Sequence, residues 1–93
     1  MREREVERKF VNAAKLRGGL ALKLVSPGMN GVPDRLVLMP GGRMAFAELK
    51  APGETMRSIQ RKRKRQLEQL GFAVYCIDRP EQIEGVLDEI TKD

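Results

Sequence analysis

Two apolar runs on either side of Pro40-Gly41-Gly42 constrain the fold most, because together they predict a β-hairpin. The runs cover residues 35–39 and 43–50, and glycine in the linking segment can adopt the positive φ that tight turns need. A three-residue loop would place Asp34 opposite Glu48, on the same face of the sheet. A two-residue loop would shift the register by one residue and put the two carboxylates on different faces.

Asp34 and the tripeptide Glu48-Leu49-Lys50 form the most informative polar group of the chain. Side chains alternate along a strand, so Glu48 and Lys50 share one face while Leu49 points the other way. Two carboxylates held together repel each other unless a cation lies between them, and oxygen ligands of this kind suit Mg²⁺ or Mn²⁺. We expect Asp34, Glu48 and the backbone carbonyl of Leu49 to bind the metal. Lys50 would orient or deprotonate the attacking water, or neutralise charge at phosphorus, so the predicted reaction is phosphodiester hydrolysis.

Hydrophobic spacing, glycine and proline divide the rest of the chain into short elements. A helix between the third and fourth strands needs a crossover and therefore a parallel strand pair, whereas the hairpin is antiparallel. The predicted class is α/β, with a mixed four-stranded sheet flanked by helices in the order αβββαβα. Helices are expected at residues 3–17, 55–70 and 80–90, and strands at 20–25, 35–39, 43–50 and 72–77. The second helix should bury Met56, Ile59, Leu67 and Leu70, and Asp78 should cap the last one.

The length of 93 residues allows one domain with a modest core, spanning residues 1–93. A net charge of +5 favours a polyanionic partner, because each phosphate that Lys or Arg neutralises releases condensed counterions. The plainer explanation of this charge is a solvated surface with surplus basic side chains. An aromatic content of 4% without tryptophan argues against recognition of single strands by stacking on aromatic side chains.

The absence of histidine and the single cysteine exclude several kinds of site. They rule out the usual zinc sites, Ser-His-Asp and Cys-His catalysis, and nucleases that bind metal through histidine. Cys76 is expected to be a core residue. No apolar run approaches the roughly 20 residues needed to span a bilayer, and the first residues lack a signal-peptide stretch. We therefore expect an intracellular, cytoplasmic protein with no membrane partner and no organic cofactor.

Several motifs, in chain order, resemble those of one nuclease family. Gly31-Val32-Pro33-Asp34 is followed at residues 46–53 by Phe-Ala-Glu-Leu-Lys-Ala-Pro-Gly. Together they resemble the PD-(D/E)XK nuclease signature, and specifically that of the virus-type replication-repair nuclease (VRR-NUC) domain. The similarity extends to residues 17–23, 26–28 and 70–72 and so covers nearly the whole chain. The bare signature recurs by chance, whereas its flanking residues, 31–33 and 50–53, make the resemblance specific.

The resemblance implies roles for further polar side chains. The family's first helix contributes an acidic side chain to the site, which here would be Glu7 or Glu3. We prefer Glu7 because it lies nearer the helix centre, whereas Glu3 lies in a terminal turn that can fray, where it favours the helix dipole. Gln60 lies on the second long helix, ten residues after Lys50 in the chain. It would hydrogen-bond a metal-bound water molecule or a phosphate at the site.

The resemblance also implies a quaternary structure and a substrate. By its resemblance to standalone family members of this length, the chain is expected to be a homodimer that acts selectively on branched DNA, including four-way junctions. Two-fold symmetry in the protein would match paired incisions. The implied setting is replication, recombination or repair in a phage or bacterium.

Arg61-Lys62-Arg63-Lys64-Arg65 is the densest run of charge in the chain. Five consecutive residues sweep more than one helical turn, so they cannot all face one ligand. Arg63 falls on the apolar stripe and would reach a phosphate or a partner from above the core, while the others would grip the DNA backbone. Lys23 and Arg35 are additional phosphate candidates, and a solvated helix face is the plainer alternative.

The leading hypothesis from the sequence is a metal-dependent DNA endonuclease with Asp34, Glu48 and Lys50 at its centre. One alternative is a non-catalytic DNA-binding module with the same fold, and another is an RNA-binding or regulatory partner protein. The intact acidic pair and lysine argue against the non-catalytic module. Taken one by one, Asp34 has the plainer explanation of an ordinary turn or strand-start residue, and Glu48 with Lys50 that of an exposed edge-strand pair.

Overall fold

The computed structural model describes residues 1–92 and contains one mixed sheet with helices on both faces. Among these residues no helix is long and apolar enough to cross a membrane. In chain order the elements are α1 (Glu3–Leu16), β1 (Leu20–Lys23), β2 (Arg35–Met39), β3 (Arg43–Leu49), α2 (Ser58–Gln69), β4 (Val74–Ile77), the 3₁₀ helix η1 (Pro80–Gln82) and α3 (Ile83–Thr91).

The strand order in the sheet is β1-β2-β3-β4, the same as in the chain. β1 with β2 and β2 with β3 are antiparallel pairs, and β3 with β4 is a parallel pair reached through the crossover helix α2. The mixed four-stranded sheet and the order αβββαβα are therefore confirmed.

The central hairpin has the register that the three-residue loop predicts. Met39 pairs with Arg43, and Arg35 pairs with Ala47. Gly41 and Gly42 in the loop have φ of 84° and 74°, a conformation that glycine adopts readily. If this register is continued by one residue, Asp34 lies opposite Glu48, so the two expected carboxylates are across from each other.

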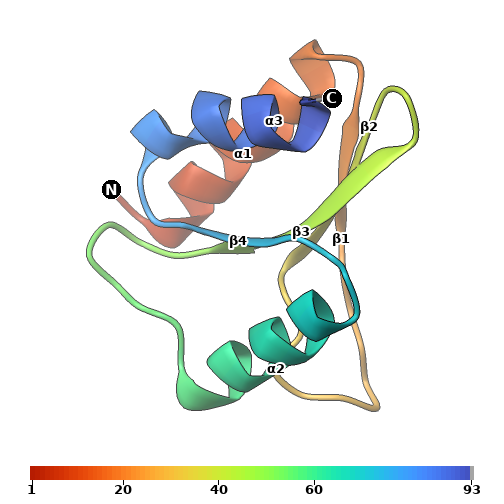
Figure 1. Cartoon of the computed structure of the whole chain (residues 1–93). Helices are drawn as coiled ribbons and strands as arrows, with labels where there is room; N and C mark the ends of the chain where they lie inside the picture. Colours follow the sequence, from red (N-terminus) through yellow and green to blue (C-terminus); the bar gives the residue numbers. More distant parts are fainter. Residues whose placement is uncertain (93) are drawn as a thin grey trace.

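α1 and α3 cover one face of the sheet and α2 covers the other (Figure 1). The main core lies under α1 and α3, where Phe10, Val37, Leu49, Ile77 and Leu87 are completely buried. Burying each such side chain contributes about 1.5–3 kcal/mol to folding. This face carries most of the stability, which leaves the other face available for polar groups.

The α2 face is thinly covered and departs from the predicted packing. Leu70 is 68% exposed rather than buried, because α2 ends at Gln69 and Leu70 is its cap residue. Gly71, with φ of 99°, then redirects the chain. The only buried residue within α2 is polar, Gln60, and the buried Met56 precedes the helix.

Element boundaries differ from the predicted ones mainly next to loops. α2 begins at Ser58 rather than at residue 55, because Arg57 has extended backbone angles and is the N-cap residue. The last helical segment is divided into η1 and α3. The expected cap role of Asp78 is wrong: its carboxylate accepts from the Gly53 N–H at 3.3 Å, and Gln82 Oε1 accepts from the Asp78 N–H instead.

Candidate active site

Asp34 and Glu48 are held together by two backbone hydrogen bonds. The Asp34 N–H donates to Glu48 Oε1 at 3.1 Å, and the Leu49 N–H donates to Asp34 Oδ2 at 2.9 Å. Each carboxylate is therefore fixed by a backbone donor from the strand that carries the other. Because backbone donors of a sheet move little, the pair is positioned before any ligand arrives.

The Glu48 carboxylate is buried, with 1% of the residue exposed. Burial, and then the negative charge of Asp34, raise the pKa of Glu48 to about 7, although the Lys50 ammonium acts to lower it. At neutral pH the side chain therefore lies close to the midpoint of its titration. A cation placed between the two carboxylates would favour the ionised form.

Lys50 lies beside this carboxylate on the same face of the strand. Its Nζ is 3.4 Å from Glu48 Oε2, and the residue is 8% exposed. The Lys50 N–H donates to the Ile77 carbonyl at 2.8 Å, so β4 holds the backbone of Lys50 while its side chain extends to Glu48. Leu49 points into the opposite core, as strand alternation predicts.

Gln60 connects α2 to the carboxylate pair. Its Nε2 donates to Glu48 Oε2, and its Oε1 accepts from the Arg57 N–H at 2.8 Å at the start of the helix. The residue is buried, as a polar group with both ends bonded can be. The sequence-based expectation placed Gln60 at the site through water or phosphate, and the structure places it directly on Glu48.

The backbone carbonyl of Leu49 lies on the edge of β3 that pairs with β2. The N–H and C=O of a strand residue point to the same side, and the Leu49 N–H donates to Asp34 on that side. Continued past Arg35, the register sets Leu49 opposite Pro33, which has no N–H to donate to the Leu49 carbonyl. This oxygen is therefore a reasonable third ligand beside the two carboxylates.

Comparison with known proteins assigns the chain to a family. No protein-family model matches it. The chain is 44% identical over 78 residues to a protein named "Putative nuclease p44" of Acyrthosiphon pisum secondary endosymbiont phage 1, which covers 84% of each sequence. It is also similar to a solved structure described as a VRR-NUC domain, with a TM-score of 0.86 and 25% identity over 92% of this chain and 94% of the other. The chain belongs to the VRR-NUC family. The family resemblance seen in the motifs is thereby confirmed, and the chain is a nuclease-like VRR-NUC domain.

The donor set of this VRR-NUC domain fits a hard divalent cation. Within residues 1–92 no group of three or more Asp, Glu, Cys or His side chains is placed to hold a metal. Asp34 and Glu48 with the Leu49 carbonyl would supply the protein ligands, which suits Mg²⁺, since it takes one or two carboxylates and completes its shell with water and phosphate oxygens.

The structure places Glu7 and Glu3 in different surroundings. Glu7 Oε2 accepts from Arg35 Nε at 2.9 Å, on the α1 face of the sheet. Partial burial raises the pKa of Glu3, and the charge of Asp34 contributes to the same rise, so Glu3 is within electrostatic reach of Asp34. Helical spacing could not distinguish the two because it does not show that Arg35 binds Glu7.

Arg35 also differs from its expected role as a phosphate ligand. It pairs with Ala47, whose side chain is in the core under α1, so Arg35 faces away from Asp34 and Glu48. One terminal nitrogen donates to the Ala21 carbonyl at 3.1 Å. Its guanidinium therefore helps to join α1, β1 and β2.

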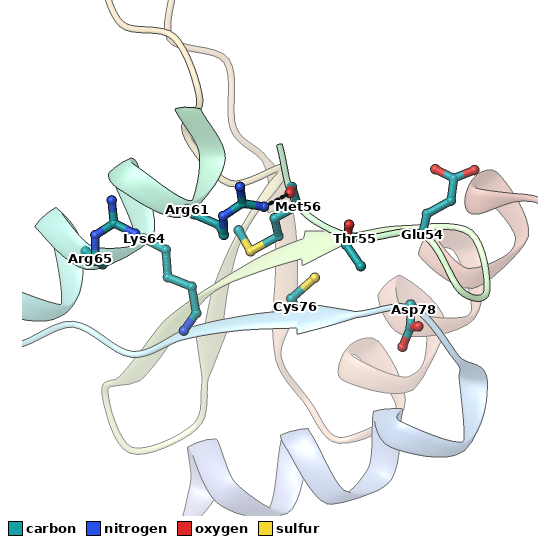
Figure 2. A pocket seen from close by; sticks show the side chains of 8 residues that line it. All are labelled: Glu54, Thr55, Met56, Arg61, Lys64, Arg65, Cys76 and Asp78. Atoms are coloured by element: carbon teal, nitrogen blue, oxygen red, sulfur yellow. Dashed lines mark hydrogen bonds between the residues drawn. The ribbon is translucent and has the colours of Figure 1, made fainter. Parts of the chain in front are cut away.

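The basic run of α2 divides between three environments. Arg63 Nε donates to the Asn30 carbonyl at 2.9 Å and so holds the loop that precedes the Asp34 segment. Lys62 is exposed, as is Lys23 at the end of β1. The other three basic residues, Arg61, Lys64 and Arg65, line a pocket beside the carboxylate pair (Figure 2). The sequence did not predict this pocket because three separate segments of the chain form its wall.

Proposed function

We propose that this VRR-NUC domain is a metal-dependent DNA endonuclease that hydrolyses phosphodiester bonds in an active site formed by Asp34, Glu48 and Lys50. Glu48 carries the proposal: a buried carboxylate faces a second carboxylate and has a pKa raised to about 7. An ion pair that only stabilised the fold would need Lys50 but would gain nothing from Asp34. Two carboxylates held together, such as Asp34 and Glu48, are favourable when the protein binds a cation between them.

Mg²⁺ or Mn²⁺ would be held by Asp34, Glu48 and the Leu49 carbonyl, and Glu3 would add negative charge near Asp34 without being a ligand. When bound, the metal would polarise the scissile phosphate and lower the pKa of a water molecule. Lys50 would place its ammonium against the negative charge that grows on the phosphoryl oxygens. Gln60 would keep Glu48 Oε2 in position through the hydrogen bond to its amide nitrogen.

DNA is the proposed substrate, and several features support it. The net charge of +5 favours a polyanion, and the family is a nuclease family. We extend the proposal to branched DNA, including four-way junctions, and to a homodimer whose two-fold axis matches paired incisions. The phage source of the 44% identical protein favours DNA replication, recombination or repair inside a phage-infected or bacterial cell.

A cleavage assay tests the activity. The purified chain is incubated with linear, nicked, flapped and four-way DNA in Mg²⁺, in Mn²⁺ and in EDTA. We expect cleavage only with metal, and a loss of roughly 100-fold or more in Asp34→Asn, Glu48→Gln and Lys50→Met. Lys9→Ala removes an exposed charge of α1 and should retain most of the activity.

Two outcomes would contradict the proposal. Tight DNA binding without cleavage in either metal would support the alternative of a non-catalytic DNA-binding module. Full activity in any one of the three variants would remove that residue from the site, provided that circular dichroism shows a native fold. Light scattering addresses the dimer: a mass near 10.5 kDa, that of one chain, would exclude paired incision by a symmetric pair.

A further inference from the structure

A cavity with a volume of about 470 Å³ opens beside the carboxylate pair. One wall is basic and comes from α2, with the side chains of Arg61, Lys64 and Arg65 (Figure 2). Cavities of about 300–1,000 Å³ take small organic ligands or parts of larger ones. The volume is therefore sufficient for a single nucleotide unit.

The opposite wall of this pocket is acidic. Glu54 and Asp78 lie at the far side from the basic wall, and Thr55, Met56 and Cys76 lie between the two walls (Figure 2). Asp78 Oδ2 accepts from the Gly53 N–H at 3.3 Å and lies 4.0 Å from Arg79 Nε, and because a carboxylate has about four acceptor positions it retains capacity for a ligand donor. Lys64 Nζ also pairs with Glu68 Oε2 at 3.2 Å, a partly exposed contact that a phosphate can replace. The pocket thus offers cations at one end, acceptors at the other and apolar contact between them.

The pocket adjoins the proposed catalytic group through two neighbouring positions. Cys76 is the register partner of Glu48 in the parallel pair of β3 and β4, so the two side chains are neighbours on the α2 face. Lys64 follows Gln60 by four residues on α2, and residues at this spacing lie on the same side of a helix. A DNA strand with its phosphate at Glu48 would therefore place an adjacent nucleotide at the pocket.

We propose that this pocket binds one unpaired, unstacked nucleotide of the DNA strand next to the scissile phosphate. The inference rests on the proposed nuclease function of the adjacent carboxylate site. The phosphate of this nucleotide lies against Lys64 and Arg65, and its base lies over Met56 and Cys76. An Arg guanidinium can stack on a base face, which suits a pocket whose lining has no aromatic residue. The amino group of the base donates to Asp78.

This placement names the class of DNA that the protein selects. A base enters the pocket only after it leaves the duplex stack, and this step takes least energy where the base is already unpaired. Branch points, bulges and frayed ends provide such nucleotides. Because cytosine and adenine carry an exocyclic amino donor on the edge and thymine does not, unpaired dC or dA binds better than unpaired dT.

A binding assay in EDTA tests the pocket without any cleavage. Fluorescence anisotropy compares two duplexes of equal length, one with a single unpaired dC and one fully paired. We expect the wild-type protein to prefer the unpaired dC by roughly tenfold. Lys64→Ala should remove this preference, whereas the matched control Lys62→Ala, one charge less on the same helix, should weaken both duplexes equally. Equal preference in both variants would overturn the inference.

Two further arms test whether a base occupies the pocket. Thr55→Phe fills it without changing the charge and should also remove the preference. An unpaired abasic site should bind no better than the paired duplex, and unpaired dT should bind less well than unpaired dC. If the abasic site binds as well as unpaired dC, the pocket takes only a phosphate, and the proposed base placement is wrong.

Cys76, the only cysteine of the chain, provides a direct reporter of the pocket. The duplex with unpaired dC should slow alkylation of Cys76 in EDTA, relative to the paired duplex. The two proposals can fail separately in these experiments. Discrimination and protection without cleavage in Mn²⁺ would contradict the nuclease function alone, and cleavage without discrimination would contradict the nucleotide pocket alone.

Discussion

The Gln60 side-chain amide donates a hydrogen bond to the buried carboxylate of Glu48, and the same amide caps the helix that carries it. Its oxygen accepts from the Arg57 N–H, so the start of α2 and the position of Glu48 depend on one side chain. The sheet face that carries Glu48 and the crossover helix are in this way joined by a polar contact where an apolar one is usual. This explains why α2 buries a glutamine instead of a leucine.

Gln60→Ala should therefore reduce stability and activity together. It removes the N-cap acceptor and leaves one oxygen of Glu48 without its amide donor, which should lower the free energy of unfolding by about 2 kcal/mol. Urea denaturation measures this. Gln69→Ala, at an exposed position of the same helix, should change it by less than about 0.5 kcal/mol. A Gln60→Ala protein as stable as the control would show that the contact contributes nothing.

Gly31→Ala should disturb the loop that leads to Asp34. Gly31 has φ of 79°, and an added Cβ would lie 2.6 Å from the carbonyl oxygen of Ile59 in α2. We expect the free energy of unfolding to fall by roughly 3 kcal/mol. In Gly42→Ala, φ is 74° but no atom lies within 4 Å of the new Cβ, so the expected loss is only about 1 kcal/mol. Equal losses would mean that backbone strain, and not the contact with α2, decides the effect.

The raised pKa of Glu48 predicts how stability depends on pH without metal. Its ordinary value is 4.5 and its value in the fold is about 7, so between these two values the folded protein binds more protons than the unfolded chain. Stability should fall as pH rises through this window, by a total of about 3 kcal/mol. Glu48→Gln should flatten the profile, measured by urea unfolding in EDTA from pH 4.5 to 8. An unchanged slope would exclude Glu48 as its source.

Metal should act on the same equilibrium in the opposite direction. A cation bound to Asp34 and Glu48 requires both to be ionised, so Mn²⁺ should raise the melting temperature more at pH 8 than at pH 5.5. Differential scanning fluorimetry with and without Mn²⁺ measures the difference. In Glu48→Gln the Mn²⁺ effect should be small at both values of pH, and a large effect there would place the metal elsewhere.

Glu3 and Glu7 should separate by the property that each substitution changes. Glu7→Gln breaks the ion pair with Arg35 and should lower the free energy of unfolding by about 1 kcal/mol with little effect on cleavage. Glu3→Gln should weaken Mn²⁺ binding and cleavage severalfold, because it removes negative charge near Asp34, while stability stays constant. Calorimetric titration of Mn²⁺ and urea denaturation of both variants provide the comparison. The reverse pattern would restore Glu7 as the third carboxylate.

Local patterns in the sequence predicted the sheet well. Pro40-Gly41-Gly42 predicted the hairpin and limited it to two registers, because the length of a tight turn fixes which residues pair, and the structure has the register of the three-residue loop. The helix between the third and fourth strands required a crossover, and so a parallel pair next to the antiparallel hairpin, and the structure has both. The prediction failed for Leu70, whose helical spacing matched the stripe although the helix ends before it. Spacing describes a helix while it lasts and says little about where it stops.

The sequence by itself determined the strands, the central hairpin with two possible registers, and the face shared by Glu48 and Lys50, because alternation and turn length act between near neighbours. Only the tertiary structure decided that Arg35 binds Glu7 and that Gln60 donates to Glu48. It also decided that basic and acidic side chains enclose a pocket beside the carboxylate pair. These contacts join segments that are distant in the chain. Their partners are selected by how helices pack across the two faces of the sheet, which depends on the whole fold.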